Sequence, residues 1–551
     1  MFNKLLQKVT SPQPPSLKEG SLSMKDLDPR VTVHYGIPST ASVLAFDPIQ
    51  RLLAVGTLDG RIKVIGGDNI EGLFVSPKQL PFKNLEFLRN QGFLVSVSNE
   101  NEIQVWDLEH RRINSTLRWE SNITAFSVIH STSYMYLGDE YGMVSVLKYD
   151  AEEGKFTQLP YYVPTDVIAE GTGISSSNQS SVVGVLPQPC SQGKRLLIAY
   201  DNGLIVLWDV SDDKVVLVRG NKDLQLKGKS IVHSSQSVRP ELSEDLQDSE
   251  QEEKEISSLC WASTDGKPKI TSTDVVKLQL SSADRRLPVI VLHWSADRSH
   301  NGGQLFVYGG DGIGSEEVLT MLCLDWSSGI ESLKCVGRVD LTLTGSFADM
   351  VLLPSLGGME SCGTLLFVLS NPGQLDVYDD ACLSSLMSRK EKGTSASSLQ
   401  YPMVIPTIEP YMTVGKLGLV YRDGKFSRDL SKEVSAAKVQ ASHTPSATLT
   451  GSMKWPLTGG VPCQFNDTEG ALVERLYVAG YQDGSVRIWD ATYPALSLIY
   501  VLGSELAGFK TASASAPVSA LEFCSSTLSL AIGNACGMVR VESFDVCLLL
   551  W

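Results

Sequence analysis

The side chains that could perform acid–base, nucleophilic or metal chemistry are scattered along this chain of 551 residues. The seven histidines stand singly, and no His-x-x-x-His, Gly-x-Ser-x-Gly or Cys-x-x-Cys pattern occurs. They are His34, His110, His130, His233, His293, His300 and His443. Because catalysis needs such groups in reach of one another, we predict no catalytic residue, no metal ligand and no cofactor.

One glycine-rich stretch could cradle a phosphate. Residues 309–315 read Gly-Gly-Asp-Gly-Ile-Gly-Ser, and closely spaced glycines let backbone N–H groups approach an anion. The stretch lacks the Lys-Ser/Thr of a P-loop and is not followed by a helical pattern. We therefore predict an ordinary loop between two strands there.

Two further residue types recur with regular surroundings, namely acids in tight turns and Trp-Asp pairs. Asp59, Asp201 and Asp483 each lie within one residue of a Gly or Asn-Gly turn, where a carboxylate can accept hydrogen bonds from nearby backbone. The Trp-Asp pairs stand at 106–107, 208–209 and 489–490. We predict structural roles for both, because each recurs in the same position of a repeated phrase.

That phrase is an apolar pair, a tight turn and an alternating strand. Its clearest copies lie at residues 55–64, 97–107, 137–146, 199–209 and 479–490. Asp-Gly or a relative supplies the positive φ of a hairpin turn, and alternation such as Val-Arg-Ile-Trp buries every second side chain. Each copy therefore predicts two adjacent strands, and apolar stretches before and after it add an inner and an outer one.

Four-stranded units that repeat about every 40–45 residues and end in Trp-Asp are typical of WD-type propeller blades. Gly60, Glu102 and Gly142 fit this period, because they are 42 and 40 residues apart. One blade cannot bury both of its own faces, so the blades must stack into a ring. We predict an all-β fold, a seven-bladed WD-type β-propeller followed by the start of a second propeller.

Four blades are predicted at residues 38–80, 81–120, 121–165 and 180–222. Blade five starts at 259–266, but a polar run at 267–274 replaces its hairpin. Either this blade lacks two strands, or the chain has lost about a hairpin of sequence, which we favour because a blade without central strands exposes unpaired edges. Apolar strands at 275–280, 289–294, 305–308 and 318–324 would complete blade five and form blade six, and 347–380 would form blade seven.

The domain prediction follows from these blades. Residues 1–30 are predicted to be a flexible tail, and 31–410 the first propeller, with a solvated acidic loop at 241–255. Residues 411–454 are predicted to be a linker or long surface loop, and 455–551 the first blades of an incomplete second propeller. A docking site for a basic partner is the alternative for the acidic loop.

Composition excludes several classes of protein. The net charge of −15 disfavours nucleic acid as a partner, since phosphate binding needs concentrated positive charge. The ten scattered cysteines predict small buried apolar side chains in a reducing compartment, with a secreted disulfide framework as the alternative. There is no apolar signal-peptide core and no run of about 18 apolar residues. We expect a cytoplasmic protein that meets the plasma membrane only peripherally, through its partners.

More restrictive motifs surround the blades. They are His-Tyr-Gly-Ile-Pro at 34–38, Ala-Phe-Asp-Pro at 45–48, Gly-Phe-Leu-Val-Ser-Val-Ser at 92–98 and Trp-Pro-Leu-Thr-Gly-Gly at 455–460. In these motifs, and over residues 30–541 as a whole, the chain resembles the lethal giant larvae and tomosyn family, and plant tomosyn-like members most closely. The departures at 267–274 and after Arg540 indicate a truncated or alternatively spliced form.

The resemblance implies a non-enzymatic scaffold that regulates vesicle exocytosis by binding syntaxin-type SNARE proteins and Rab-type GTPases. Tomosyn-like members add a SNARE-like coiled coil, but this sequence has no sustained heptads. The alternative is a generic propeller adaptor, such as a ubiquitin-ligase substrate receptor or a signalling scaffold. An enzyme would instead require ionisable side chains that converge in the central channel. The partner-binding residues cannot be predicted from these motifs.

Overall fold

The computed structural model describes the chain in separate stretches. They are residues 34–66, 71–172, 180–189, 191–220, 229–230, 256–262, 275–276, 278–280, 288–297, 302–310, 317–326, 332–343, 345–354, 364–379, 382–385, 399–401, 410–421, 473–491, 497–503 and 516–543. The predicted tail, the acidic loop and the Trp-Pro-Leu-Thr-Gly-Gly motif lie outside the described residues.

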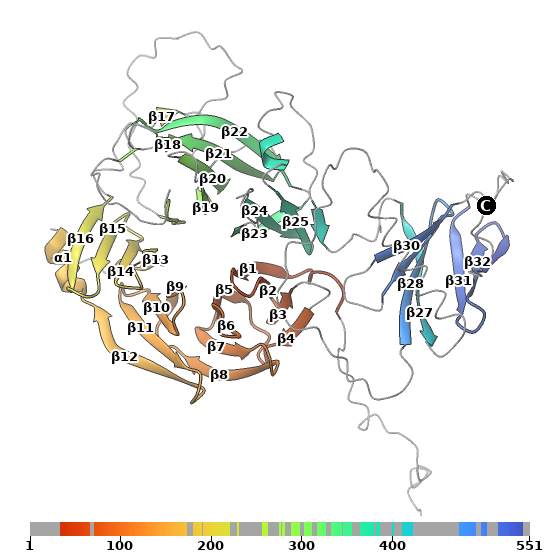
Figure 1. Cartoon of the computed structure of the whole chain (residues 1–551), viewed down its shortest axis with the longest axis horizontal. Helices are drawn as coiled ribbons and strands as arrows, with labels where there is room; N and C mark the ends of the chain where they lie inside the picture. The colour runs from red at the N-terminus through yellow and green to blue at the C-terminus, as the bar shows by residue number, and fades with distance from the viewer. Residues whose placement is uncertain are drawn as a thin grey trace, which may run out of the picture. The chain divides into compact units, whose positions relative to one another are not determined.

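The first four blades fall inside their predicted ranges, each as an antiparallel four-stranded sheet in chain order (Figure 1). Their strands are β1 (Ala41–Asp47), β2 (Leu52–Thr57), β3 (Arg61–Ile65), β4 (Glu71–Val75), β5 (Phe82–Leu88), β6 (Phe93–Ser98), β7 (Glu102–Asp107), β8 (Arg112–Arg118), β9 (Ile123–Val128), β10 (Tyr134–Asp139), β11 (Val144–Asp150), β12 (Lys155–Val163), β13 (Val182–Pro187), β14 (Arg195–Tyr200), β15 (Ile205–Asp209) and β16 (Lys214–Arg219). The first strand of each sheet lies innermost, since β1, β5, β9 and β13 contact one another in sequence.

The tight turns have the backbone conformation that the repeated phrase predicts. Gly60, between β2 and β3, has a φ of +75°, and a Cβ there would lie 2.5 Å from Gln79 Cα. Gly142 and Gly203 have φ values of +84° and +85° at the same position of their blades. Glycine therefore allows both the turn and the close approach of the connection to the next blade.

The prediction for blades five and six was wrong. The segments that begin at 289, 305 and 318 belong to one sheet, which is completed by an outer strand that was not predicted. Its strands are β19 (Val289–Asp297), β20 (Gly302–Gly309), β21 (Val318–Asp325) and β22 (Lys334–Thr342). The four strands are eight or nine residues long, longer than the segments predicted. Three segments that were predicted to be divided between blades five and six therefore lie in a single blade.

At the fifth position in the ring, the structure describes residues 256–262, which do not belong to a sheet. Leu259 packs against Gly184 of β13, where an added Cβ would lie 2.5 Å from Leu259 Cδ1. On the other side, Ser258 Oγ accepts a hydrogen bond from Leu292 N of β19 at 3.0 Å. Nearby, β17 (Lys229–Ser230) and β18 (Leu278–Gln279) form a two-residue parallel pair. Residues 256–262 thus bridge β13 and β19 in place of an inner strand.

The last blade of the ring closes onto the first. Its strands are β23 (Ser346–Pro354), β24 (Thr364–Asn371), β25 (Gln374–Tyr378) and the short β26 (Leu399–Tyr401). β23 contacts β1, and a buried apolar cluster joins Leu53 and Val55 of the first sheet to Phe367 of the last. Six described sheets and the bridging segment therefore make seven positions around the ring, as predicted.

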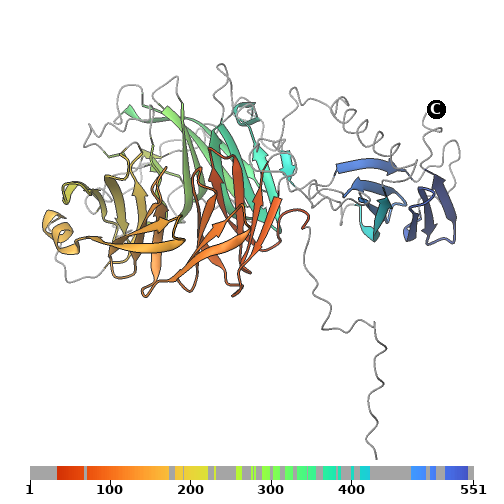
Figure 2. The ribbon, with the colours of Figure 1, turned by 60° about the horizontal axis from the view of Figure 1, so that its bottom comes forward.

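The helix α1 (Thr165–Thr172) follows β12 and contacts β16 at the edge of the fourth blade (Figure 2). No helix among the described residues is both long and apolar enough to span a membrane.

A second group of blades begins earlier than predicted. Its first sheet comprises β27 (Met412–Tyr421), β28 (Val473–Tyr481), β29 (Val486–Asp490) and β30 (Ser497–Leu502), and its second β31 (Val518–Cys524), β32 (Ser529–Asn534) and β33 (Val539–Ser543). The prediction of a linker over 411–454 was therefore wrong at its start. The partner of β27 in the sheet, β28, follows more than 50 residues later, so this pairing is not local.

Candidate functional site

The antiparallel order of the blades gives the ring two different faces. We call the face where each inner strand begins the start face; the turns between second and third strands and the links between blades lie there too. The opposite, end face carries the turns between first and second and between third and fourth strands. Loops on a rigid scaffold are the usual place for partner binding, so the two faces are the candidate sites.

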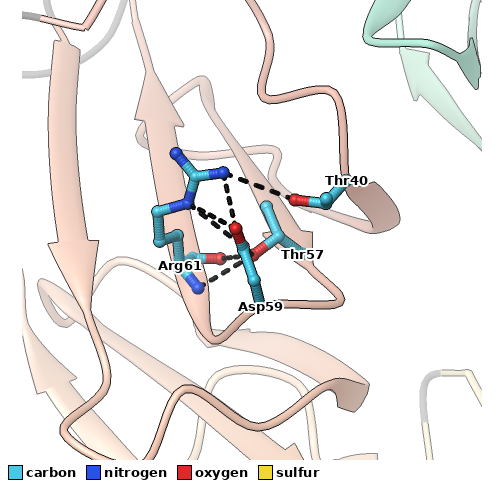
Figure 3. A network of polar contacts seen from close by, with 4 residues as sticks. All are labelled: Thr40, Thr57, Asp59 and Arg61. Atoms are coloured by element: carbon cyan, nitrogen blue, oxygen red, sulfur yellow. Dashed lines mark hydrogen bonds and ion pairs between the residues drawn. The ribbon is translucent and has the colours of Figure 1, made fainter.

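The start face of the first blade is held by a polar network of four residues (Figure 3). Arg61 Nη2 donates to Asp59 Oδ2 at 2.6 Å, and Arg61 N donates to Thr57 Oγ1 at 2.8 Å. Arg61 Nη2 also lies 3.5 Å from Thr40 Oγ1, before the inner strand. The hydrogen bond from Arg61 is the main cause that lowers the pKa of Asp59 to about 2. This acid is therefore an ionised turn anchor and not a proton donor at neutral pH.

Of the three turn acids predicted to accept backbone hydrogen bonds, only Asp483 does so, since Asp59 binds the side chains of Arg61 and Thr57. A turn acid that was not singled out, Asp139, also acts on backbone groups. Asp139 Oδ1 accepts hydrogen bonds from Tyr141 N and Met143 N, at 3.0 and 2.9 Å. Asp483 Oδ1 accepts one from Ser485 N at 2.9 Å. In the fourth blade this role falls to Asn202 and not to Asp201, because Asn202 Oδ1 binds Leu204 N at 3.0 Å.

The Trp-Asp pairs anchor packing and turns, as predicted. Trp106 and Trp208 are buried, and their indole N–H groups donate to Ser96 Oγ at 2.8 Å and to Tyr161 OH at 3.0 Å. The aspartate of the second pair, Asp209, accepts hydrogen bonds through Oδ1 from the backbone of the turn that follows.

Ionisable groups on the inner strands connect neighbouring blades. Glu86 Oε2 on β5 accepts a hydrogen bond from Val128 N on β9 at 2.9 Å. Asp349 Oδ2 on β23 accepts one from Leu44 N on β1 at 2.7 Å. Burial raises the pKa of both carboxyls to about 7. His293 on β19 forms a backbone hydrogen bond to Met350 on β23, and burial lowers its pKa to about 4.

At one place several of these groups do influence one another. Glu86 and Asp47 both raise the pKa of Arg89, which is lowered overall by burial. The oxygens of Asp47 are occupied by backbone N–H groups of its own turn and by Asn90 N at 2.8 Å. The cluster therefore joins the first two blades at the end face.

In the described stretches, no three His, Cys, Asp or Glu side chains are grouped so as to hold a metal ion.

The remaining residues singled out in the sequence take simple positions. Gly309 and Gly310 begin the connection between β20 and β21 with φ values of +91° and +78°, as expected of a loop between strands, and 311–316 lie outside the described residues. Of the six described cysteines, Cys260, Cys323, Cys335 and Cys382 are partly buried. Cys524 and Cys536 are exposed, so the expectation of buried cysteines was wrong for these two.

One surface feature was missed by the sequence analysis. Tyr141, Met143 and Tyr162 are 52%, 40% and 57% exposed at the start-face edge of the third blade. We call these three side chains the Tyr-Met patch. The acids Glu120 and Glu140 are exposed in the neighbouring loop and turn. Large apolar residues in the turn after Asp139, where polar ones are usual, were the signal that could have revealed it.

Comparison with known proteins agrees with the predicted family. No family model matches the chain. Lethal(2) giant larvae protein homolog 1 of Bos taurus is 22% identical over 503 residues, which cover 86% of this chain. Lethal(2) giant larvae protein of Drosophila pseudoobscura pseudoobscura is 24% identical over 518 residues, or 88% of the chain. This chain is a relative of the lethal giant larvae proteins.

The similarity is partial in length. The chain spans 43% of the Bos taurus protein and 38% of the Drosophila protein, less than half of each. LLGL scribble cell polarity complex component 2 of Danio rerio is 28% identical over 206 residues, 34% of this chain. Among solved structures, Saccharomyces cerevisiae Sqt1 covers 63% of this chain with a TM-score of 0.37 and 11% identity. Closeness to plant members stays a prediction.

Proposed function

We propose that this relative of the lethal giant larvae proteins is a non-enzymatic scaffold that regulates vesicle exocytosis by binding syntaxin-type SNARE proteins and Rab-type GTPases. The proposal includes a cytoplasmic location and a peripheral association with the plasma membrane through these partners. The observation that carries it is similarity to lethal giant larvae proteins over 86% of the chain. A scaffold role agrees with the described geometry, in which polar groups hold turns and join neighbouring blades.

The arrangement of ionisable groups supports binding over catalysis. Glu86 and Asp349 are the acids on inner strands with raised pKa values, and each already accepts a backbone hydrogen bond from the next blade. A general base must instead present a free lone pair to its substrate. The described turns and links of the start face, in contrast, present exposed apolar and acidic side chains to solvent. Such a surface suits protein partners.

The test is a pull-down of the full chain with immobilised cytosolic regions of plasma-membrane syntaxin-type SNAREs. An unrelated WD propeller of similar net charge is the control for adsorption. We expect enrichment of this chain and none of the control. A parallel column of Rab-type GTPases loaded with a GTP analogue or with GDP tests the second partner, with binding expected in the GTP form. Equal recovery of chain and control on every column would contradict the proposal and favour a generic adaptor.

A further inference from the structure

The Tyr-Met patch is a compact surface and not three unrelated exposures. In the register of the third blade, Tyr162 on β12 is paired with Ser145 on β11. Asp139 N donates to Met143 O at 3.0 Å, so the ladder continues to Met143, two residues before Ser145 and on the same side of the sheet. Met143 and Tyr162 are therefore diagonal neighbours, within reach for long side chains. Tyr141 lies in the same turn.

The turn that carries the patch is rigid. Asp139 holds Tyr141 N and Met143 N through one carboxylate oxygen, and its second oxygen accepts a hydrogen bond from Ser121 Oγ at 2.9 Å. Ser121 Oγ in turn lies 3.1 Å from the Trp119 indole N–H, which packs on the core between the second and third blades. Because the turn is already held in place, binding of a partner here costs little conformational entropy. Such preorganised positions are typical of binding hot spots.

Two acids lie beside the apolar side chains, and one of them, Glu140, is also close enough to Lys83 to oppose the lowering of that lysine's pKa by burial. Glu120 is exposed and has no ion pair among the described residues, and Glu140 is exposed with Oε1 engaged to Asn122 N at 3.1 Å. The end face of the ring differs, since Ile49, 55% exposed, is its one strongly exposed large apolar side chain in the first four described blades. On the start face, the first blade also exposes Leu58 and Val75, 53% and 52%, but the acid beside them, Asp59, is paired with Arg61. Apolar exposure beside an acid that has no ion pair among the described residues, Glu120, thus distinguishes the start face at the third blade.

We infer that the Tyr-Met patch binds an amphipathic α-helix of a partner whose apolar stripe is flanked by Lys or Arg. Aromatic rings and a methionine are the side chains that fit the ridges of an apolar helix face, and Met adapts to irregular shapes. Glu120 and Glu140 then face the basic flank, which fixes orientation and raises the association rate. The inference rests on the proposal that the ring is a binding scaffold, but not on the identity of the partner.

The test uses the full chain and a labelled peptide of about 18 residues, five helical turns, with Leu on one face and Lys on its flanks. A matched peptide has Glu in place of Lys. By fluorescence anisotropy we expect the Lys peptide to bind at least about tenfold more tightly than the Glu peptide, with the difference shrinking at high salt. The double variant Met143→Ser, Tyr162→Ser is expected to lose about tenfold in affinity.

Two controls keep the test decisive. Ile49→Ser removes an exposed apolar side chain from the end face, and its affinity is expected to stay within about twofold of the parent. Glu120→Lys is expected to weaken the Lys peptide and strengthen the Glu peptide. Equal affinity of both peptides, or unchanged binding by the double variant, would overturn the inference. If the double variant also binds syntaxin-type SNAREs as the parent does, the scaffold function stands and the patch is not its site.

Discussion

The blades of the ring and the last described sheet differ in how many of their faces are covered. In the first blade, Leu53 and Val55 pack toward the last blade, while Ala54 and Ile62 pack toward the second. In β31–β33, Leu530 and Ile532 pack against β27–β30, but Val539 and Val541 on the other side are 70% and 67% exposed. The same strand chemistry therefore yields a fully buried sheet or a half-buried one, according to its neighbours.

The difference teaches that stability in this molecule comes from stacking between blades more than from any single sheet. Hydrophobic burial contributes about 25 cal/mol for each Å² of apolar surface removed from water, so a sheet covered on one side gains roughly half as much. Nearest-neighbour stacking of this kind makes end units the first to open. We expect hydrogen exchange to be faster in β31–β33 than in the first four blades.

The largest effect is expected from a cavity in the doubly covered part. Trp208→Ala removes a buried indole from the cluster between the third and fourth blades. The opening free energy of ring peptides should fall by about 3–5 kcal/mol. Hydrogen exchange followed by mass spectrometry measures it, with Val216→Ala on the neighbouring exposed position as control. An equal loss in β28 and β29 would show that the two groups of blades do not open separately.

A smaller effect is expected where the ring closes. Asp349→Ala leaves Leu44 N without its acceptor at the contact between β23 and β1. At pH 5.5 the loss should be about 1–3 kcal/mol, the cost of an unsatisfied buried N–H. Asp349→Asn keeps an acceptor oxygen and is expected to retain most of the stability. The comparison is made by denaturant unfolding of the ring, and equal losses in both variants would refute a role for this hydrogen bond.

The pH dependence of the ring should come partly from Glu86. Its folded pKa of about 7 lies above the ordinary value for glutamate, so the folded state binds more protons than the unfolded state between about pH 4.5 and 7. The stability that the neutral form gives is full below this window and is lost as the pH rises through 7. Glu86→Gln should reduce the fall in unfolding free energy between pH 5 and 8 by about 2.5 kcal/mol, the value for a pKa of about 7 against an ordinary one of about 4.5. An unchanged pH profile would contradict the raised pKa.

The smallest effect is expected on the uncovered face of the last sheet. Val541→Ala removes two methyl groups that solvent already contacts, so stability should change by less than about 0.5 kcal/mol. Ile532→Val, on the covered face of the same sheet, should cost about 0.5–1.5 kcal/mol. Exchange rates in β32 report both. A large loss from Val541→Ala would show that this face is covered in solution.

The sequence predicted those parts of the fold where local turn chemistry and strand periodicity coincide. The first four blades satisfy this condition, because each carries a turn such as that at Gly60 or Gly142. It failed at β27, whose partner in the sheet lies more than 50 residues away, and at the fifth position, where Leu259 and Ser258 pack without a hairpin. Non-local pairing leaves no mark on neighbouring residues.

The candidate site was less predictable than the fold. Glu86 shares its inner strand with the polar residues Lys83 and Asn84, so its type does not set it apart, and only the ring brings it to Val128 N of the next blade. The Tyr-Met patch likewise needs the register that sets Tyr162 opposite Ser145. Met143 and Tyr162, which are far apart in sequence, become neighbours because the outer strand pairs with the strand after the hairpin turn. Composition alone cannot show this. The turn acids, in contrast, act on residues near them in sequence, and the predicted backbone hydrogen bond is present at Asp483.

The contact between β1 and β23 can form only late in translation, because the two strands lie far apart in the sequence. Leu44 and its acceptor Asp349 are separated by 305 residues. The face of the first blade that packs against the last blade therefore stays uncovered until almost the whole ring has been translated. At about 5–20 residues per second this interval lasts on the order of 15–60 s. During that time Leu53 and Val55 are exposed on an otherwise formed sheet. We therefore expect the nascent chain to be most prone to aggregation before the last blade leaves the ribosome.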